Sequence, residues 1–511
     1  MKYIMLFSWR QQLSVLLLVF SVAWARGNET PNVLLISIDD LNDWVGCLGG
    51  NSQASTPHID RLAERGILFS NAHCQAPICD PSRTSFMLGL RPSTTGIYVN
   101  RPWFRLTKRN VNRTTMSQYF GHHGYKTITA GKIYHGSRVD KASFQLTGPR
   151  PGQRLSIDER LVPDIGSSSK LWDFGPQVYD EREFGDAVTA SWVIEQLRKE
   201  HAKPFFMAAG FYRPHVPFYA PQRFFDSHPL RAVHTPDVKQ DDCDDLPTAA
   251  LELTNLTVPP SHSWFVENNQ WKPAVQAYLA SVSFTDAQVG RLLDALDHSP
   301  HAHNTIVVLF SDHGFHLGEK QRWAKQSLWE RSTRVPLIIS LPNGLQGKTC
   351  KRPVELLSIY PTLLDLCGLP ARDDLEGVSP KPLLNDPEAV WEHVAVTTYQ
   401  RNNHAVRSQH YRYIRYADGS EELYDHRVDP QEWNNLAGHA GMSPLIKQHA
   451  AWLPHQNVLE ARVSVKNSAA PRNSAPPGNS VTPGSSAPSE RGAAPNSMRR
   501  SGNENQKPKI K

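Results

Sequence analysis

Short, almost wholly apolar runs alternate along this 511-residue chain with longer segments in which apolar residues recur every three to four positions. The first run spans residues 32–38, and similar runs lie at 67–72, 126–130, 204–210, 305–311 and 335–340. A near-continuous apolar run is typical of a strand that is buried on both faces. Because these runs alternate with amphipathic segments, the sequence predicts an α/β fold with a doubly wound, mostly parallel sheet.

Two of the intervening segments have a clear helical pattern. The first begins at Thr56-Pro57, where Thr56 is suited to cap a helix and Pro57 to its first turn, and it ends at Gly66. The second is a longer apolar stripe over residues 275–296. Helices of this kind bury one face, so we expect them to cover the predicted sheet.

The character of the chain changes near residue 390. Residues 26–390 carry the alternating pattern and are expected to form the large α/β domain. Further on, the runs 410–416 and 421–424 flank Asp418-Gly419, a dipeptide typical of a tight hairpin turn. The sequence therefore predicts a smaller antiparallel subdomain over residues 391–463.

From Ser464 onward Pro, Ser, Asn, Gly and Ala dominate, and large apolar residues almost disappear. Such a segment cannot bury enough apolar surface to fold, so residues 464–511 are predicted to be a disordered basic tail. The tail holds eight basic and two acidic residues, which account for the whole net charge of +6. The rest of the chain is electrically balanced, and we expect no nucleic-acid partner.

Residues 1–25 have the pattern of a signal peptide. Lys2 and Arg10 precede a mostly apolar run from Leu13 to Val22, and Ala23-Trp24-Ala25 forms a small-x-small cleavage site. An uncleaved N-terminal anchor is the alternative. Because no later run approaches the ~20 apolar residues of a membrane span, we expect no stable membrane insertion. The protein is predicted to be exported to the periplasm, the extracellular space or a lysosomal lumen, depending on the host.

Metal-type ligands follow two of the predicted strands. Asp39-Asp40 comes directly after the first run, and Asp312-His313-Gly314 follows the run 305–311. Ligands of a doubly wound sheet bind at the carboxyl ends of its strands, so these side chains are expected to converge. Oxygen-rich ligation favours Ca²⁺ or Mg²⁺ over Zn²⁺. The plainer alternative for an isolated Asp-Asp pair is a helix cap or a loop.

Cationic side chains gather at the same predicted edge. Cys79 to Arg83 leads into a helix-like stretch, and a helix N-terminus with an arginine fork is suited to an anion. Other candidates after strands or in nearby loops are Lys132, His135, Arg213, His215 and Lys325. Taken singly, each of these is more often a solvated side chain. Together they predict a site for a multiply charged oxyanion beside a cation.

The spacing Cys79-x-Pro81-Ser82-Arg83 resembles the core signature of the type I, formylglycine-dependent sulfatases. The order and spacing of further motifs from about residue 32 to 437 are similar to that family, namely Asp39-Asp40, Gly131-Lys132-x-x-His135, His215, Asp312-His313-Gly314, Lys325 and the run 422–437. Within the family, the segments 213–218, 323–325 and 354–358 resemble those of the iduronate-2-sulfatase group. The segment Met87–Leu90 departs from the family's usual Leu-Thr-Gly-Arg, and Arg213 stands where the iduronate type carries Lys.

The resemblance implies an alkaline-phosphatase-like fold and a sulfatase acting on a sulfated sugar, such as an iduronate-2-sulfate-like unit of a glycosaminoglycan or related polysaccharide. It implies that a formylglycine-generating or equivalent maturase converts Cys79 to formylglycine, whose hydrate attacks sulfur. It implies roles for His215 as proton donor, for His135 in sulfate release, for Arg213 in sugar binding, and for Lys132, Lys325 and Arg83 in charge neutralisation. The implied cation is Ca²⁺, with Mg²⁺ as the alternative, and its implied ligands are Asp39, Asp40, Cys79, Asp312 and His313.

Two other classes of function stay open on the sequence. A phosphate or phosphonate monoester hydrolase would use the same scaffold, since the site would also accept a phosphate monoester. A non-catalytic polyanion-binding protein would keep Cys79 as a thiol and use the basic tail. Among the other cysteines, Cys350 and Cys367 are candidates for a disulfide, as an exported chain allows.

Overall fold

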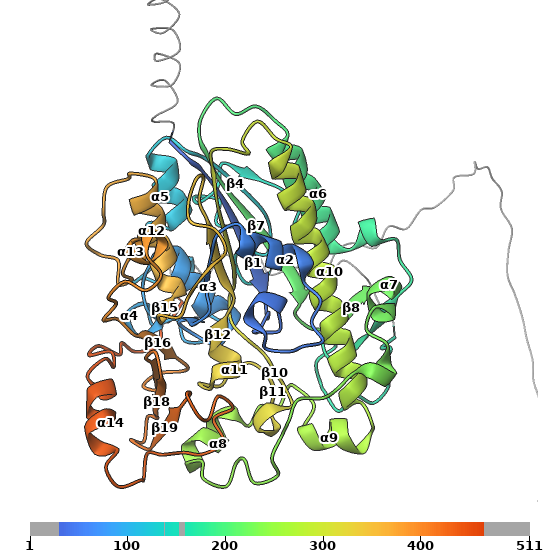
Figure 1. Ribbon diagram of the computed structural model, residues 1–511, viewed down its shortest axis with the longest axis vertical. Helices are drawn as coiled ribbons and strands as arrows, with labels where there is room; N and C mark the ends of the chain where they lie inside the picture. The colour runs from blue at the N-terminus through green and yellow to red at the C-terminus, as the bar shows by residue number, and fades with distance from the viewer. Residues whose placement is uncertain (1–29, 137, 153–158, 464–511) are drawn as a thin grey trace, which may run out of the picture. The chain divides into compact units, whose positions relative to one another are not determined.

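The apolar runs of the sequence supply most of the strands of one large sheet. The structure is a computed structural model that describes residues 30–136, 138–152 and 159–463 (Figure 1). The predicted signal peptide and basic tail lie outside the described residues. Within them, eight strands form one sheet in the order β14 (Lys348–Cys350), β2 (Ile67–Phe69), β13 (Leu337–Ser340), β9 (Thr305–Ser311), β1 (Asn32–Asp39), β7 (Phe205–Pro214), β4 (Lys126–Gly131) and β5 (Leu146–Thr147).

The sheet is mostly parallel, as predicted. Strands β9, β1, β7, β4 and β5 all pair in parallel, and β14 is parallel to β2. Strand β13 is the exception, because it pairs antiparallel with both β9 and β2. The predicted run 335–340 is divided between β12 (Arg334–Val335), which joins a separate small sheet, and β13.

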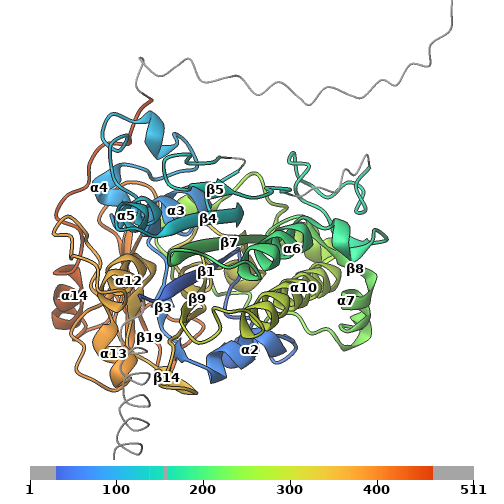
Figure 2. The ribbon, with the colours of Figure 1, turned by 90° about the horizontal axis from the view of Figure 1, so that it is seen from above.

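Helices cover both faces of this sheet (Figure 2). On β1, Leu34, Ile36 and Ile38 belong to the core that includes α2 (Pro57–Glu64), α6 (Gly185–Leu197) and α10 (Trp271–Asp297). Val33 and Leu35 point to the opposite core, which is completed by helices α3 (Cys79–Leu88), α5 (Met116–His122) and α12 (Ile359–Leu366). Because side chains alternate along a strand, one continuous apolar run supplies both cores.

Helix α2 matches the predicted amphipathic segment, but it is not capped by Thr56. The Thr56 hydroxyl accepts a hydrogen bond from the Gly46 N–H over 2.8 Å. The first N–H groups of the helix instead meet a carboxylate of α10, since Ile59 N–H donates to Asp286 over 2.7 Å. A distant side chain thus satisfies donors that helices leave unpaired at their N-termini.

The C-terminal part of the described chain contains a separate antiparallel sheet. Its strands are β16 (Ala395–Thr398), β17 (His404–Arg407), β18 (Tyr411–Arg415) and β19 (Glu421–Asp425), followed by α14 (Ser443–Ala450). The predicted hairpin is confirmed as β18 and β19, in which Arg415 pairs with Glu421. The placement of a subdomain boundary near residue 390 stays a prediction.

The described structure also bears on the cysteines and on membrane-spanning helices. All six cysteines are free thiols, so the suggested Cys350–Cys367 disulfide is wrong. Cys350 instead ends β14 with its sulfur 3.4 Å from the Pro387 carbonyl oxygen. None of the helices in the described part of the chain has the length and hydropathy that a bilayer crossing requires.

Candidate active site

The ends of β1 and β9 bring the predicted metal ligands together. The two strands are in parallel register up to Ile38 opposite Ser311, so Asp39-Asp40 and Asp312-His313 leave the sheet side by side. Asp40 adopts a left-handed backbone with φ of 64°, which is uncommon for a residue other than glycine. Its carbonyl oxygen accepts a 2.8 Å hydrogen bond from the Tyr278 hydroxyl, which in turn accepts from the Asn42 N–H over 3.0 Å.

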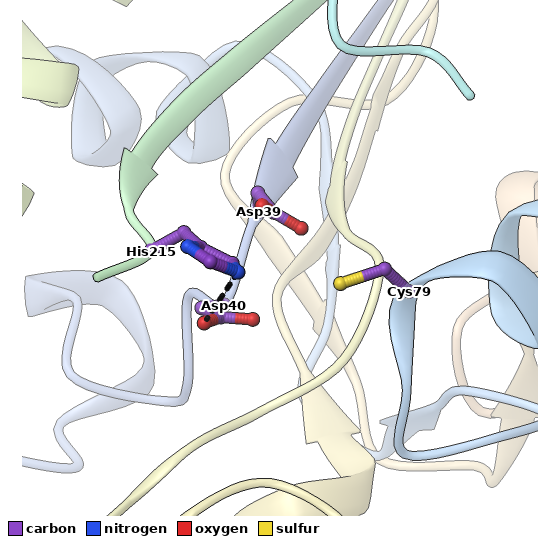
Figure 3. Close-up of side chains that lie close together, drawn as sticks. All are labelled: Asp39, Asp40, Cys79 and His215. Carbon is purple, nitrogen blue, oxygen red and sulfur yellow. Dashed lines mark ion pairs between the residues drawn. The ribbon is translucent and has the colours of Figure 1, made fainter. Parts of the chain in front are cut away.

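This turn directs the Asp40 carboxylate into a group of cationic or potentially cationic side chains. Lys325 Nζ lies 2.7 and 2.8 Å from its two oxygens, and His313 Nδ1 lies 3.4 Å away. His215 approaches from the end of β7, with Nε2 3.9 Å from Asp40, and Cys79 faces the same space from α3 (Figure 3). Four side chains from segments that are far apart in sequence therefore gather around one carboxylate.

Cys79 is the first residue of α3, after an extended Ile78. Its sulfur lies 3.3 Å from His313 Nε2 and 4.0 Å from Lys132 Nζ. Burial on its own raises the pKa of the Cys79 thiol, but Lys132, Lys325 and His313 outweigh burial and bring that pKa well below its ordinary value. A helix N-terminus surrounded by cations stabilises negative charge at this side chain, whatever group carries it.

Arg83 lies one helical turn behind Cys79 and is completely buried. Its Nε donates to Asp312 over 2.7 Å, and another nitrogen lies 3.2 Å from Asp39. The same guanidinium also donates to the carbonyl oxygens of Lys132 and Ile133. One planar fork thus joins α3 to the ends of β1, β9 and β4, which a lysine could not do.

The carboxylates of the site carry unequal charge. Burial raises the pKa of Asp312 to about 8. Burial acts in the same direction on Asp39, but Lys132, His215 and Arg83 outweigh it and leave the Asp39 pKa below its ordinary range. Two equally buried carboxylates of one site therefore differ in charge at neutral pH, because the cations act more strongly on Asp39 than on Asp312.

The site contains two overlapping groups of potential metal ligands, and within each group all ligand atoms lie within 4.8 Å of one another. One comprises Asp39, Asp40, Cys79 and His215, and the other Asp39, Cys79, Asp312 and His313. All of these side chains are buried. Mostly oxygen donors with one or two imidazoles fit the cation that the sequence predicts.

A third group, Glu330, His426 and Glu432, has similar spacing but a different environment. Arg407 and Arg412 both pair with Glu330, and Arg412 also lies 2.7 Å from Glu432. Two arginines already balance the two carboxylates. This cluster is a largely buried ion-pair network between α11 (Glu330–Thr333) and the C-terminal sheet.

The structure also places the remaining predicted site residues. His135 is largely buried and contacts Cys79, and burial lowers its pKa, which keeps the imidazole neutral at neutral pH. Arg213 is only 4% exposed, and its guanidinium donates to the carbonyl oxygens of Tyr219 and His215 over 3.0 and 3.4 Å. The contact of Arg213 with a sugar stays a prediction.

Two residues that support the site, Asn100 and Arg138, were not predicted from the sequence. Asn100 accepts a 3.0 Å hydrogen bond from the Asp80 N–H, and Arg138 donates to the Asp80 carboxylate over 2.8 Å. Arg138 also contacts the Asn100 carbonyl oxygen. These residues hold the start of α3, and therefore Cys79, from two loops that have no regular pattern.

Comparison with known proteins agrees with this geometry. Residues 31–369 match the family model described as Sulfatase, and residues 318–458 match that of the N-sulphoglucosamine sulphohydrolase C-terminal region. A protein named Sulfatase from Formosa agariphila is 42% identical over 443 residues, which cover 84% of this chain and 87% of that protein. Iduronate 2-sulfatase of Mus musculus is 34% identical over 427 residues, covering 71% and 74%.

A solved structure of a protein in complex with its substrate D-glucosamine-2-N,6-O-disulfate has the same fold, with a TM-score of 0.66 and 22% identity over 83% of this chain and 96% of that chain. The Sulfatase family model spans well over half of the present chain, and the two relatives cover more than two thirds of it. The chain therefore belongs to the sulfatase family, and the protein is a sulfuric ester hydrolase.

Proposed function

We propose that the protein hydrolyses the sulfate ester of an anionic sugar unit such as iduronate 2-sulfate, in a glycosaminoglycan or related polysaccharide. The observation that carries this proposal is the position of Cys79, at the N-terminus of α3 with Lys132 and His313 beside its sulfur. The iduronate 2-sulfatase relative supports the sugar class. The export signal expected at residues 1–25 would deliver the enzyme to a compartment that contains such polysaccharides.

The proposal includes two groups that the chain acquires. Cys79 would be converted to formylglycine by a maturase, and the hydrated aldehyde supplies a hydroxyl nucleophile. A Ca²⁺ ion, or Mg²⁺ as the alternative, would be held by Asp39, Asp40, Asp312 and His313, and it supplies Lewis-acid charge stabilisation. The buried carboxylates and the cation-lined position of Cys79 fit both groups.

The chain's own residues then have separable tasks. Lys132 is buried, Lys325 is only 10% exposed, and the charges of both ammonium groups act on Cys79, so they would bind the oxygens of the transferring sulfate. Both are held in place by carboxylates, Lys132 by Asp39 and Lys325 by Asp40. Arg83 has a different task, because its guanidinium is already bonded to Asp312 and Asp39. It holds these two carboxylates in place.

His215 is arranged to give a proton to the leaving sugar oxygen. Its Nδ1 lies 2.6 Å from the Val216 carbonyl oxygen, which only accepts, so Nδ1 keeps its proton. Nε2 is the atom that faces the site beside Asp40 and can exchange a proton with substrate. His135, neutral and in contact with Cys79, is suited to take up a proton during sulfate release.

The first test is mass spectrometry of the peptide that contains Cys79, in protein from the native host. Conversion to formylglycine lowers the peptide mass by about 18 Da. An unmodified thiol in active enzyme would overturn the proposed nucleophile. Cys79→Ala should abolish turnover without affecting folding, and Cys243→Ala, at a half-buried thiol, is the matched control.

The second test separates the candidate substrates. Purified enzyme is offered iduronate 2-sulfate and glucosamine sulfate units, together with phosphate and phosphonate monoesters. We expect sulfate esters to be preferred and the 2-sulfated uronate to have the highest kcat/KM. Faster turnover of the phosphate or phosphonate esters would favour the alternative hydrolase, and turnover of none would favour a binding protein.

A further inference from the structure

Strand β7 contains a bulge where it enters the site. Residues of β1 and β7 pair one to one from Val33–Phe206 to Ile38–Phe211, but the next pair is Asp39–Pro214. Tyr212 and Arg213 are therefore extra residues of β7. The pairing of β7 with β4 also ends before them, at Gly210. Bulges of this kind redirect side chains and are common beside active sites.

A carboxylate of α6 holds the bulge. The N–H groups of Tyr212 and Arg213 donate to the two oxygens of Asp186 over 2.7 and 2.8 Å. Asp186 is the second residue of α6 and is 4% exposed. It replaces the strand partner that the bulge removes, because buried N–H groups without acceptors are costly.

The bulge places the Tyr212 ring between two groups of the site. Lys132 Nζ lies 4.3 Å from the ring centroid, over its face. The His215 ring lies 5.0 Å from it in a T-shaped arrangement of 68°. Lys132 is thus held by the Asp39 carboxylate, the Cys79 sulfur and an aromatic face.

We propose that Tyr212 is a positioning residue, which fixes the Lys132 ammonium beside Cys79 and orients the His215 imidazole. The inference rests on the proposed roles of those two residues. The ring makes both contacts, while the side chain also lines a cavity of about 220 Å³ together with Lys132, Thr189 and Gly210. An aromatic ring is therefore required at this position, and the hydroxyl is not.

The test compares Tyr212→Phe with Tyr212→Leu. Phe keeps the face under Lys132 and the edge against His215, so its kcat/KM should stay within about twofold of wild type. Leu removes both, and kcat/KM should fall about 3- to 30-fold, the range that cation–π contacts support from exposed to desolvated sites. The fall should be larger for a sugar sulfate than for nitrophenyl sulfate, because only the former depends on His215 as an acid.

Tyr179→Leu, at a tyrosine that is 40% exposed, is the matched control and should leave kcat/KM unchanged. The Tm of each variant shows whether a loss of kcat/KM comes from a destabilised fold. Asp186→Asn keeps only one acceptor for the two N–H groups, so it should lower kcat/KM as Tyr212→Leu does, with the same preference for the sugar sulfate.

Equal activity of Tyr212→Phe and Tyr212→Leu, or an equal loss on both substrates, would overturn the inference. These ratios are measured on whichever ester the wild type turns over. If that ester proves to be a phosphate or phosphonate, the substrate assignment fails, while the Phe and Leu comparison still decides whether Tyr212 positions the site.

Discussion

Arg83 and Asp312 form a 2.7 Å ion pair in which neither side chain is exposed to solvent. The pair joins the helix that carries Cys79 to the strand end that carries His313. Because Arg83 also lies 3.2 Å from Asp39, its removal would take the arginine partner from both buried carboxylates and leave Asp39 with Lys132 as its remaining cation. Arg83 thus contributes to stability and to the geometry of the site through the same contacts.

Arg83→Met should therefore lower the free energy of unfolding by about 3–5 kcal/mol, as is usual when one partner of a buried pair is removed. Urea denaturation measures this change, and activity should be lost as well. Arg61→Met breaks an exposed pair with Asp294 and should cost only about 0–1 kcal/mol. Similar losses for the two variants would contradict a structural role for Arg83.

Two C-terminal truncations should differ in their effect on stability, because only the longer one removes residues that contact the folded protein. Removal of residues 464–511 should leave kcat on a small sulfate ester and Tm nearly unchanged, because the tail has few large apolar residues to pack. Removal of residues 457–511 also deletes hydrogen bonds from Val458 N–H to Ser93, from Ala461 N–H to Gly96, and from the Tyr98 hydroxyl to Val458. At about 1 kcal/mol each, these bonds predict a clearly lower Tm for the longer deletion alone.

A tenfold fall in kcat for the shorter deletion would show that the tail contributes to the folded enzyme. An equal Tm for both deletions would show that the segment 457–463 is dispensable.

His215→Ala should affect substrates according to their leaving groups. A sugar hydroxyl needs a proton to depart, whereas nitrophenolate carries its own charge away. The loss in kcat/KM should be about 10²–10⁴-fold on a sugar sulfate and much smaller on nitrophenyl sulfate. His135→Ala should slow both substrates alike, since it acts at sulfate release. Equal losses for His215→Ala would reassign the acid, with Lys325 as the next candidate.

Stability should fall in mild acid because of His316. Burial lowers the pKa of His316 to about 3, with Arg331 adding to the effect, and the ring bonds to Ser327 and the Glu319 carbonyl. The unfolded chain binds the proton more readily, with a pKa near 6.5, so stability is full above that pH and declines as the pH drops toward 3. At pH 5 the decline from this residue is about 2 kcal/mol.

The measurement is the free energy of unfolding between pH 5 and 7 for wild type and His316→Gln. The variant should have a shallower dependence on pH by about one proton. Parallel curves would mean that His316 is protonated in the folded protein.

Much of the fold could be predicted because the strands of the large sheet are buried on both faces and therefore read as apolar runs. The metal-type ligands were recognisable for a related reason, since Asp39, Asp40, Asp312 and His313 directly follow such runs. The motif of Cys79 and Arg83 was recognisable because it is a short contiguous stretch that resembles the signature of the sulfatase family. In each case the signal is local in the sequence.

The tertiary structure decided the contacts that give these residues their roles. Tyr212 contacts Lys132 from a bulge that Asp186 holds, and no pattern in the sequence predicts this bulge. Tyr278, on a helix more than two hundred residues away, supports the left-handed turn at Asp40. The sequence by itself determined which side chains stand at the strand ends. Their distances and charges depend on partners that only packing brings near, because hydrogen bonds and ion pairs act over a few ångströms whatever the separation along the chain.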